Sequence, residues 1–354
     1  MQQLKKDKIY AVAMSGGVDS STTAAIIQKS GAKVFGVTMN IHENCDKAIE
    51  DASKICQKLG IEHFVLDAKD SFKKYIMETF VEYYANGLTP NPCAFCNRDI
   101  KLNLLLKFAK SHGADIMATG HYVNMSVIEN NVTMKEADNP KKDQSYFLSL
   151  SSKENLKDVI FPLGSFSSKD ETRRLASEFG LHNFEKKDSQ DICFIPDGDY
   201  KNFIRNFKTN QNLFSPGLIK LNNGKILGEH SGIIDYTIGQ RKGLGISYKD
   251  PLYVLKLDSE HNEIILGQKD DLDISEFKAN QLNWIIDTPD NFEAFVKLRS
   301  LCQKSKALIK KDGDFIKIQL IEKSKTSVTP GQICAIYNEQ NIVIGAGIIQ
   351  SLVF

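Results

Sequence analysis

The feature that most constrains the fold is the stretch YAVAMSGGVDSSTTAAII, at residues 10–27. An apolar run meets two glycines, an aspartate and two serines follow, and a run of small and apolar residues comes next. This order predicts a strand that turns through SGGVDS into a helix. Such turns bind phosphate, because glycine lets the backbone approach the oxygens and the N–H groups at a helix start attract an anion.

The residues that follow continue the alternation of strands and helices. We expect strands at 8–15, 32–40, 62–68 and 114–121, and helices at 20–29, 45–59, 71–84 and 97–112. This alternation predicts an α/β fold, a doubly wound parallel sheet with helices on both faces. Ligands of such sheets lie at the carboxyl ends of the strands. We therefore expect SGGVDS, VTMN at 37–40 and ATGH at 118–121 to line one crevice.

The second part of the chain has a different texture. After about residue 207 it consists of short alternating runs broken by Gly, Asn, Asp and Pro, which are typical of β-hairpins. We therefore expect a catalytic domain at 1–207, a small central β-rich domain at 208–272 and a C-terminal, barrel-like domain at 273–354.

Composition limits the class of protein. The chain has 354 residues, 42% of them hydrophobic, with no apolar run of about 18 residues and no signal-peptide pattern at its start. We expect no membrane segment and a cytoplasmic protein. The net charge of +1 does not indicate a nucleic-acid partner, so such a partner would have to bind to local basic patches. The seven cysteines suggest reactive or metal-bound thiols rather than structural disulfides.

Asp19 is the informative residue of the first loop. A carboxylate there repels phosphate unless Mg²⁺ bridges the two, so the loop predicts a magnesium–nucleotide site. The loop lacks the lysine with which the commoner ATP-binding loop holds the terminal phosphates. It therefore suits a site in which pyrophosphate leaves and an adenylate forms. The alternative is a capped strand–helix turn in a non-catalytic protein.

SGGVDS resembles the pyrophosphate-binding loop of the N-type ATP pyrophosphatases. Six further stretches resemble motifs of one family. They are TPNPCAFCNRDIKL at 89–102, ATGHY at 118–122, KKDQSYFL at 141–148, DSQDICFIPDG at 188–198, YTIGQRKGLGI at 236–246, and TPGQ at 329–332. Together and in this order they resemble the bacterial tRNA-specific 2-thiouridylases, the MnmA/TrmU family. A small-molecule adenylylating synthetase is the competing interpretation, but it would need neither paired cysteines nor a β-rich tRNA-binding domain.

The resemblance implies a fold of the adenine-nucleotide alpha hydrolase type and an ATP-dependent sulfur transfer. The carbon-2 oxygen of the wobble uridine is adenylylated, sulfur from a cysteine persulfide replaces it, and AMP leaves. ATP and Mg²⁺ are the implied cofactors. The implied partners are tRNAs for lysine, glutamate and glutamine, and a sulfur donor such as a cysteine desulfurase or a relay protein.

The resemblance also assigns the two cysteines of the sulfur step. Cys96 matches the nucleophile and Cys193 the persulfide carrier, and a Cys96–Cys193 disulfide would form when the sulfur is released. The sequence does not separate release of free sulfide by Cys96 from direct attack of the persulfide on the base. We expect Cys96 to lie near the start of the helix at 97–112, where the helix dipole would lower its pKa.

Cys93 departs from the family pattern, which has an aspartate at this position. It forms Cys-x-x-Cys with Cys96. Together with Cys193 these thiols are an alternative site for a [4Fe–4S] cluster with one open iron that could bind sulfide. The plainer interpretation is that Cys93 only lines the pocket. We expect Cys56, Cys302 and Cys334 to be inert, and Cys45 lies in no motif.

The remaining expectations are carried over from the family motifs. The residues expected to bind ATP are Ala13, Met14, Ser15, Gly16, Gly17, Val18, Asp19, Ser20, Met39 and Gly120. The residues expected to contact the tRNA or its target base are Asn91, Pro92, Cys93, His121, Lys142, Asp143, Gln144, Arg299, Ser300 and Gln332. The family often has a tyrosine where Ser300 stands, so a platform for base stacking is missing here.

Overall fold

The computed structural model describes residues 4–181, 183, 192–195, 197–207, 214–322 and 327–350. Part of the predicted motif at 188–198 therefore lies outside the described residues, but Cys193 lies within them. Over the described residues, no helix combines the length and the apolar character needed to cross a membrane.

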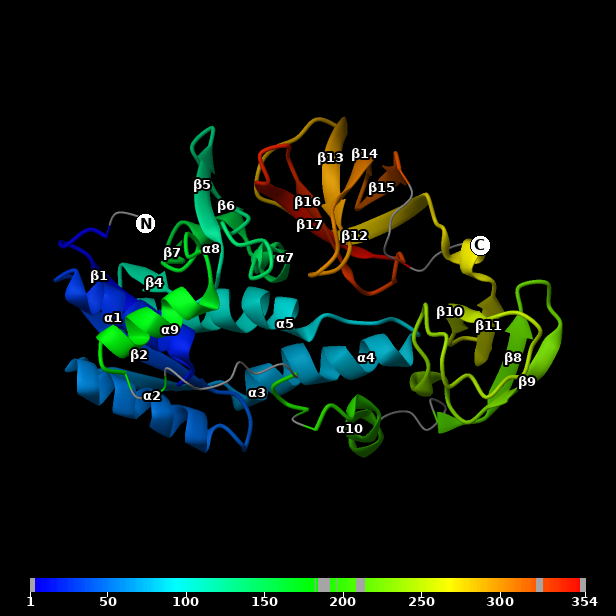
Figure 1. Cartoon of the computed structure of the whole chain (residues 1–354), viewed down its shortest axis with the longest axis horizontal. Coiled ribbons are helices and arrows are strands. Elements are labelled where there is room, and N and C mark those ends of the chain that lie inside the picture. Colours follow the sequence, from blue (N-terminus) through cyan, green and yellow to red (C-terminus); the bar gives the residue numbers. More distant parts are fainter. Residues whose placement is uncertain are drawn as a thin grey trace.

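The first part of the chain builds a parallel sheet. It has five strands in the order β3-β2-β1-β4-β7, and each strand runs parallel to its neighbours (Figure 1). The bounds are Ile9–Ala13 for β1, Lys33–Asn40 for β2, His63–Asp67 for β3, Ile116–Ala118 for β4 and Val159–Ile160 for β7. The predicted parallel sheet is confirmed, and β1 lies at its centre, between β2 and β4.

Helices cover both faces of this sheet. Because side chains alternate along a strand, Tyr10 and Val12 of β1 pack on one face and Ala11 on the other. The helices on the Val12 face are α1 (Val18–Lys29), α2 (Asp46–Leu59) and α9 (Lys169–Glu178). The doubly wound arrangement is thus confirmed, and α1 begins directly after the SGGVDS turn.

Two continuous helical runs cover the Ala11 face. The first joins α3 (Lys69–Phe72), the π-helix η1 (Lys73–Glu78) and α4 (Thr79–Ala85). The second joins α5 (Pro92–Phe95), the π-helix η2 (Cys96–Leu105) and α6 (Leu106–Ser111). The helix predicted at 97–112 therefore begins at Pro92, one turn earlier. Pro92 suits the first helical position because its missing N–H has no partner there anyway.

Between β4 and α9 the structure has elements for which we made no prediction. A hairpin of β5 (Asn124–Ile128) and β6 (Asn131–Lys135) turns through Glu129 and Asn130, which both have positive φ. This is the backbone that a two-residue hairpin loop requires. The other elements are α7 (Ser145–Leu148) and α8 (Lys153–Leu156); α10 (Tyr200–Asn206) follows α9.

The predicted β-rich regions form two separate sheets. The central one has four strands in the order β10-β11-β8-β9, with β8 at Gly217–Leu221, β9 at Ile226–His230, β10 at Tyr253–Asp258 and β11 at Glu263–Gly267. Short 3₁₀-helices, η4 (Ile233–Asp235) and η5 (Lys269–Leu272), flank it.

The C-terminal sheet closes into a barrel in the order β12-β15-β14-β13-β16-β17. Its strands are Glu276–Trp284 (β12), Asn291–Lys297 (β13), Ser305–Asp312 (β14), Phe315–Leu320 (β15), Ile333–Tyr337 (β16) and Val343–Ile349 (β17). Closure pairs every strand on both sides and leaves no exposed sheet edge.

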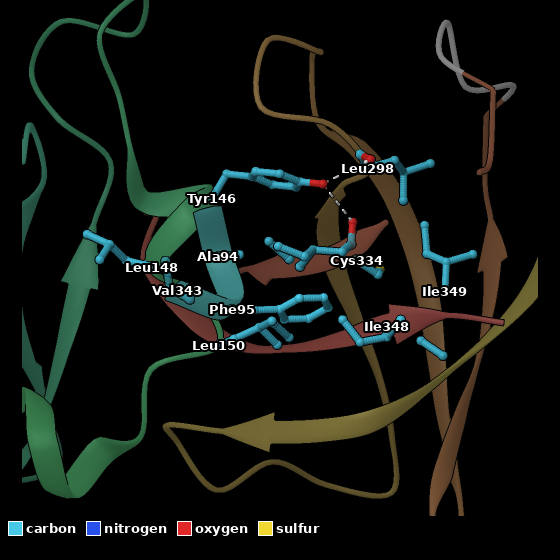
Figure 2. Close-up of a cluster of buried hydrophobic side chains, with 14 of the residues drawn as sticks. Ala94, Phe95, Tyr146, Leu148, Leu150, Leu298, Cys334, Val343, Ile348 and Ile349 are labelled. Atoms are coloured by element: carbon cyan, nitrogen blue, oxygen red, sulfur yellow. Dashed lines mark hydrogen bonds between the residues drawn. The ribbon is translucent and has the colours of Figure 1, made fainter. Parts of the chain in front are cut away.

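The barrel packs against the helical run that carries Cys93 and Cys96. Phe95 of α5 and Tyr146 of α7 are buried against Ile348 of β17 and its neighbours in one apolar cluster (Figure 2). The Tyr146 hydroxyl donates to the Ile333 carbonyl at 3.2 Å. Phe95 lies on α5, which continues directly into η2. Its apolar contact therefore holds the start of the helix that carries Cys93 and Cys96 against the barrel.

Candidate active site

The loop after β1 has the backbone of an anion-binding turn. Gly16 has φ of +68°, and a Cβ on it would lie 2.7 Å from the Asp51 Cβ atom. Glycine is therefore required here both for the backbone angle and for the close approach of α2. Gly17 is the N-cap of α1, so the free N–H groups of the first helical turn lie in this loop.

Hydroxyl groups brace the same loop from inside. The Ser15 N–H donates to the Ser20 Oγ at 3.2 Å, and the Ser20 Oγ donates to the Gly17 carbonyl at 3.1 Å. The Ser21 Oγ donates to the same carbonyl at 2.9 Å. These contacts hold the turn in shape.

Asp19 meets two groups from distant parts of the chain. Its carboxylate accepts from the Lys169 Nζ at 2.7 and 2.6 Å, and from the Tyr122 hydroxyl at 2.7 Å. The same hydroxyl lies 2.7 Å from the Thr172 Oγ1. Lys169 thus brings a positive charge to a loop that has no lysine of its own.

Sequence reasoning missed Lys169. The signal that was available is the sequence S-x-x-E at Ser168 and Glu171, which marks a helix start. The Ser168 Oγ does accept from the Glu171 N–H, at 3.2 Å. This pattern places Lys169 at the first position of a helix, but it says nothing about which loop that helix end meets.

The end of β4 completes the crevice at the carboxyl ends of the strands. A Cβ on Gly120 would lie 2.8 Å from the Ser20 N atom, so only glycine allows this approach. His121 is held by the Thr119 Oγ1 at 2.7 Å from its Nδ1. Burial lowers the pKa of His121 well below its usual value, with a smaller contribution from Lys101, so the ring is neutral.

The expected adenine wall at Met39 lies on β2, the strand next to β1. Met39 is half-buried and packs against the apolar core. Met14, directly after β1, donates its N–H to the Val37 carbonyl of β2 at 2.8 Å. The ends of β1, β2 and β4 therefore lie side by side, as the crevice requires.

Cys96 lies inside the helical run and not at its start. Asn91 is the N-cap, and its Oδ1 accepts from the Ala94 N–H at 3.2 Å. Cys96 follows one turn later, as the first residue of η2. Burial raises the pKa of the Cys96 thiol to about 11. The expectation that the helix dipole would lower this pKa is therefore wrong, because the thiol is past the first turn and desolvation is the larger effect.

Cys93 and Cys193 belong to the same cluster. Burial raises the pKa of Cys93, and it raises that of Cys193 to about 12, with further contributions from Cys96, Cys93 and Cys45. Both side chains keep solvent-exposed surface, but protein atoms surround them closely enough to disfavour a thiolate. Cys96 and Cys93 thus both raise the pKa of Cys193, and so does Cys45, which the sequence reasoning had set aside.

The cysteines outside this cluster differ in burial. Cys56 and Cys334 are buried in apolar cores, as expected of inert residues. Cys302 is half-buried, and its Sγ donates to the Arg299 carbonyl at 3.1 Å. All seven thiols are free, so a Cys96–Cys193 disulfide stays a prediction for one stage of the reaction.

The sequence suggested two metal sites, a [4Fe–4S] cluster on three thiols and Mg²⁺ at Asp19. Within the described parts of the chain, no three His, Cys, Asp or Glu side chains converge closely enough to hold a metal ion. The geometry of Cys93, Cys96 and Cys193 therefore gives no support to the cluster alternative. A Mg²⁺ ion needs fewer protein ligands, since it binds one or two carboxylates together with substrate phosphates. The Asp19 carboxylate in the SGGVDS loop fits this requirement.

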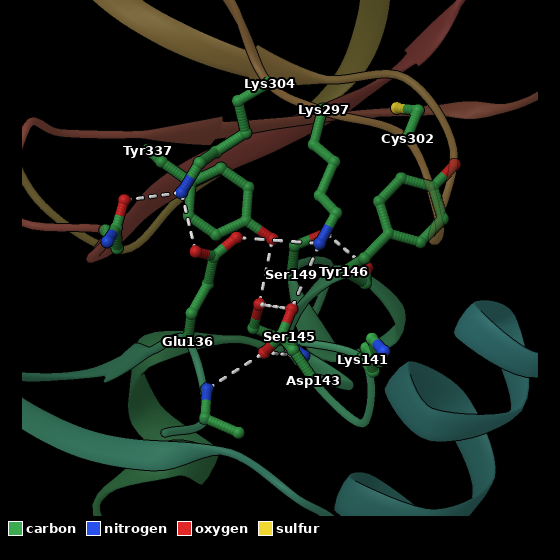
Figure 3. A network of polar contacts seen from close by, with 12 residues as sticks. Glu136, Lys141, Asp143, Ser145, Tyr146, Ser149, Lys297, Cys302, Lys304 and Tyr337 are labelled. Carbon is green, nitrogen blue, oxygen red and sulfur yellow. Dashed lines mark hydrogen bonds and ion pairs between the residues drawn. The ribbon is translucent and has the colours of Figure 1, made fainter. Parts of the chain in front are cut away.

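The predicted tRNA-contact segment at 142–144 lies at the junction with the barrel. Asp143 is buried: it accepts from the Lys297 Nζ at 3.1 Å and from the Ser145 Oγ at 2.8 Å (Figure 3). The Gln144 Oε1 accepts from the Tyr122 N–H at 2.8 Å, and Lys142 is half-buried. In this structure Asp143 therefore joins the domains, and its surface is not available to RNA.

Gln332 of the TPGQ motif also lies where the barrel meets the first part of the chain. Its Nε2 donates to the Thr89 carbonyl at 2.9 Å and to the Pro90 carbonyl at 3.3 Å. A Cβ on Gly331 would lie 2.8 Å from the Thr89 N atom. The motif thus braces the segment that leads into Asn91 and Pro92.

Arg299 and Ser300 remain near the surface of the barrel. Arg299 is exposed, and its Nη2 donates to the Thr329 Oγ1 at 2.7 Å and to the Ser327 Oγ at 3.3 Å. Ser300 is half-buried and lines a cavity together with Lys141, which precedes α7.

Comparison with known families and proteins gives a consistent result. The tRNA methyl transferase HUP domain matches residues 8–197, the tRNA methyl transferase PRC-barrel domain matches 201–268, and the aminomethyltransferase beta-barrel domain matches 274–349. A tRNA-specific 2-thiouridylase MnmA 1 of Fusobacterium nucleatum is 45% identical over 343 residues, which are 96% of this chain and 92% of that protein. A tRNA-specific 2-thiouridylase MnmA of Rickettsia canadensis is 44% identical over 363 residues, 98% of each chain.

Proposed function

The chain belongs to the family of tRNA-specific 2-thiouridylases, and from this premise we propose that it replaces the carbon-2 oxygen of a tRNA wobble uridine by sulfur, using ATP. The observation that carries the proposal is the meeting of two groups of residues. Gly120 and His121 border the SGGVDS loop, and the charge of Lys101 acts both on His121 and on the three clustered thiols. These shared neighbours support the proposal that an activating site adjoins a sulfur-carrying site.

In the first step the loop binds ATP. Residues 13–20 with Met39 and Gly120 are the proposed binding residues, and the free N–H groups at the start of α1 favour the phosphates. Asp19 would hold Mg²⁺ together with the phosphates, and the ion would neutralise part of their charge. The uridine oxygen attacks the α-phosphorus and pyrophosphate leaves, so the oxygen becomes part of a good leaving group.

In the second step Cys193 carries the sulfur as a persulfide. In one route the Cys96 thiolate attacks the Cys193 Sγ, the bond to the terminal sulfur breaks, and the released sulfide attacks carbon 2. In the other route the terminal sulfur attacks carbon 2 first, and Cys96 then attacks the Cys193 Sγ. Both routes expel AMP and end in a Cys96–Cys193 disulfide, which thiols of the sulfur donor reduce.

The tRNA is proposed to lie across the junction of the domains. We retain the division at 1–207, 208–272 and 273–354, with the last as the tRNA-binding domain. Arg299, Ser300 and Lys142 are proposed contacts to the RNA, and Asn91, Pro92 and Cys93 are proposed to meet the target base. For Asp143 and Gln332 we propose that they position this surface, since their side chains already bind protein groups. Cytoplasmic tRNAs for lysine, glutamate and glutamine are the proposed substrates.

The test is a reaction of the full chain with unmodified tRNA, ATP, Mg²⁺ and a cysteine desulfurase, followed by mass spectrometry of the nucleosides. Cys193→Ser is expected to abolish 2-thiouridine while release of pyrophosphate persists, because only the sulfur step lacks its carrier. Cys56→Ser is the matched control, since this thiol lies in the core away from the cluster. Thiolated tRNA from Cys193→Ser would contradict the persulfide role.

The same reaction separates the persulfide from the iron–sulfur alternative. Protein is purified without oxygen, its iron and acid-labile sulfide are measured, and the reaction is repeated after a chelator has removed iron. Full activity in iron-free protein is expected under the persulfide route. Activity that follows the iron content would support the cluster instead.

A further inference from the structure

Lys101 is a half-buried lysine that the sequence analysis left without a role. It ends the stretch FCNRDIK and lies on the π-helix η2, five residues after Cys96. It is the residue that the cysteines and His121 share as a charged neighbour.

The π-helix explains how Lys101 reaches the cysteines. Hydrogen bonds in a π-helix join residues five apart, so such residues lie nearly one above the other. In an α-helix of 3.6 residues per turn, the same two residues would point about 140° apart. The change from α5 to η2 occurs at Cys96, and it therefore turns Lys101 to the side on which Cys96 lies. Departures of this kind inside helices are frequent at functional sites.

Lys101 opposes the effect of burial on the pKa values of these thiols. Burial raises the pKa of Cys93, Cys96 and Cys193, and Lys101 is the one cation of the described residues that lowers all three. The groups that act against it are the neighbouring thiols, Cys45 at Cys193 and Asp99 at Cys96.

The other cation of the stretch FCNRDIK, Arg98, is held by neighbouring residues. Arg98 donates from Nε and Nη2 to the two oxygens of Asp99, both at 2.8 Å. Its guanidinium also lies over the Phe95 ring, 5.2 Å from the centroid. Asp99 and Phe95 thus hold Arg98, and Lys101 supplies the positive charge that lowers the pKa of the thiols.

We propose that Lys101 is the cation that stabilises the sulfur anions of the Cys93–Cys96–Cys193 cluster, and that the π-helical geometry of η2 places Lys101 beside these thiols. This inference rests on the proposed function. When the Cys96 thiolate bonds to the Cys193 Sγ, the bond to the terminal sulfur breaks and its electron pair leaves with the sulfide. One negative charge moves from sulfur to sulfur, and a cation beside both stabilises it before and after the transfer.

The inference is tested by thiol chemistry, without tRNA or ATP. The full chain is treated with limiting iodoacetamide at several pH values between about 7 and 9, where only thiolate reacts. Mass spectrometry of the peptides gives separate rates for Cys96 and Cys193. Lys101→Met is expected to shift both rate–pH profiles by about one unit toward high pH, the lower end for a nearby opposite charge. At a fixed pH each rate falls about tenfold.

Three further variants make the result specific. Lys101→Arg keeps the charge and is expected to restore most of the rate, and Lys101→Gln repeats the loss with a polar side chain in case Met perturbs the fold. Lys107→Met removes an exposed lysine from α6, in the same helical run, and is expected to leave both profiles unchanged.

Profiles for Lys101→Met and Lys101→Gln that coincide with that of the unaltered protein would overturn the inference. So would a loss that Lys107→Met reproduces. The result is independent of the proposed function, because failure of the unaltered protein to thiolate tRNA would leave the alkylation rates as they are. Conversely, an active enzyme with unshifted profiles would refute the role of Lys101 alone.

Discussion

At the scale of single residues, the Asp19 carboxylate is the group that we propose to hold Mg²⁺ beside the bound ATP. It is held by Lys169 and Tyr122, and the Lys169 side chain is only 9% exposed. A Mg²⁺ ion that approached with ATP would compete with this ammonium group for the same oxygens. We expect Lys169 then to turn to the pyrophosphate oxygens, which would give the loop the positive charge that its sequence lacks.

Lys169→Met tests this role. We expect release of pyrophosphate to fall roughly a hundredfold, the loss typical of one donor that stabilises charge in a transition state. Formation of pyrophosphate from ATP and tRNA is measured with limiting enzyme. Arg174→Met is the matched control, because Arg174 lies on the same helix and pairs with Glu178 in solvent. Equal rates for the two variants would show that Lys169 is only structural.

At the scale of elements, the TPGQ turn connects the barrel to the segment before the cysteine helix. Thr89 donates its N–H to the Pro330 carbonyl at 2.9 Å, and Gly331 approaches Thr89 too closely for a side chain. The turn therefore sets where Asn91 begins α5, and through α5 it sets the position of η2. A short loop motif of the barrel thus helps to place the cysteines of another domain.

Gly331→Ala is expected to weaken this connection. Gly331 has φ of +88°, which alone costs an alanine about 1–2 kcal/mol, and the contact with Thr89 adds to the loss. Gly313→Ala is the control, since Gly313 has φ of +63° but open space around it. Urea unfolding is followed by fluorescence of Trp284, which lies on β12 and is the single tryptophan. Equal losses of unfolding free energy in the two variants would refute the close contact.

At the scale of the whole molecule, a buried ion pair joins the catalytic domain to the barrel. The side chains of Lys297 and Asp143 are 6% and 1% exposed. The Ser145 Oγ lies 2.9 Å from the Tyr337 hydroxyl, and Lys304 binds Glu136 at 2.6 Å, so the pair is part of a larger network. A network of this kind tolerates few arrangements, which suits a surface on which an RNA must be held in one register.

A double-mutant cycle tests the pair. Lys297→Met is expected to lower the free energy of unfolding by about 3–5 kcal/mol, because it leaves the Asp143 carboxylate buried without its cation. Asp143→Asn is expected to cost less, because Lys297 keeps the Glu136 carboxylate at 3.5 Å. The double variant is expected to lose much less than the sum. Lys306→Met, which breaks the exposed pair with Glu293, is expected to change little. Additive losses in the cycle would mean that the two groups do not stabilise each other.

Much of the fold could be predicted because its signals are local. The strand–turn–helix order at residues 10–27 and the alternation after it predicted the parallel sheet, and the hairpin pattern predicted the β-rich regions. The helix start at Pro92 was misplaced, since the sequence signal of Asn91 and Pro92 was interpreted as a contact to the target base and not as an N-cap. The hairpin at β5 and β6 was not predicted.

The sequence by itself determined the βα alternation, the anion-binding loop and the Cys-x-x-Cys motif of Cys93 and Cys96, because each depends on residues that are close together in the chain. Only the tertiary structure decided which charges meet. The ammonium group beside Asp19 comes from Lys169, Asp143 is buried against Lys297 of the barrel, and Lys101 turns toward the cysteines on a π-helix. Burial and electrostatic energy depend on distances in space, and these do not follow from local patterns.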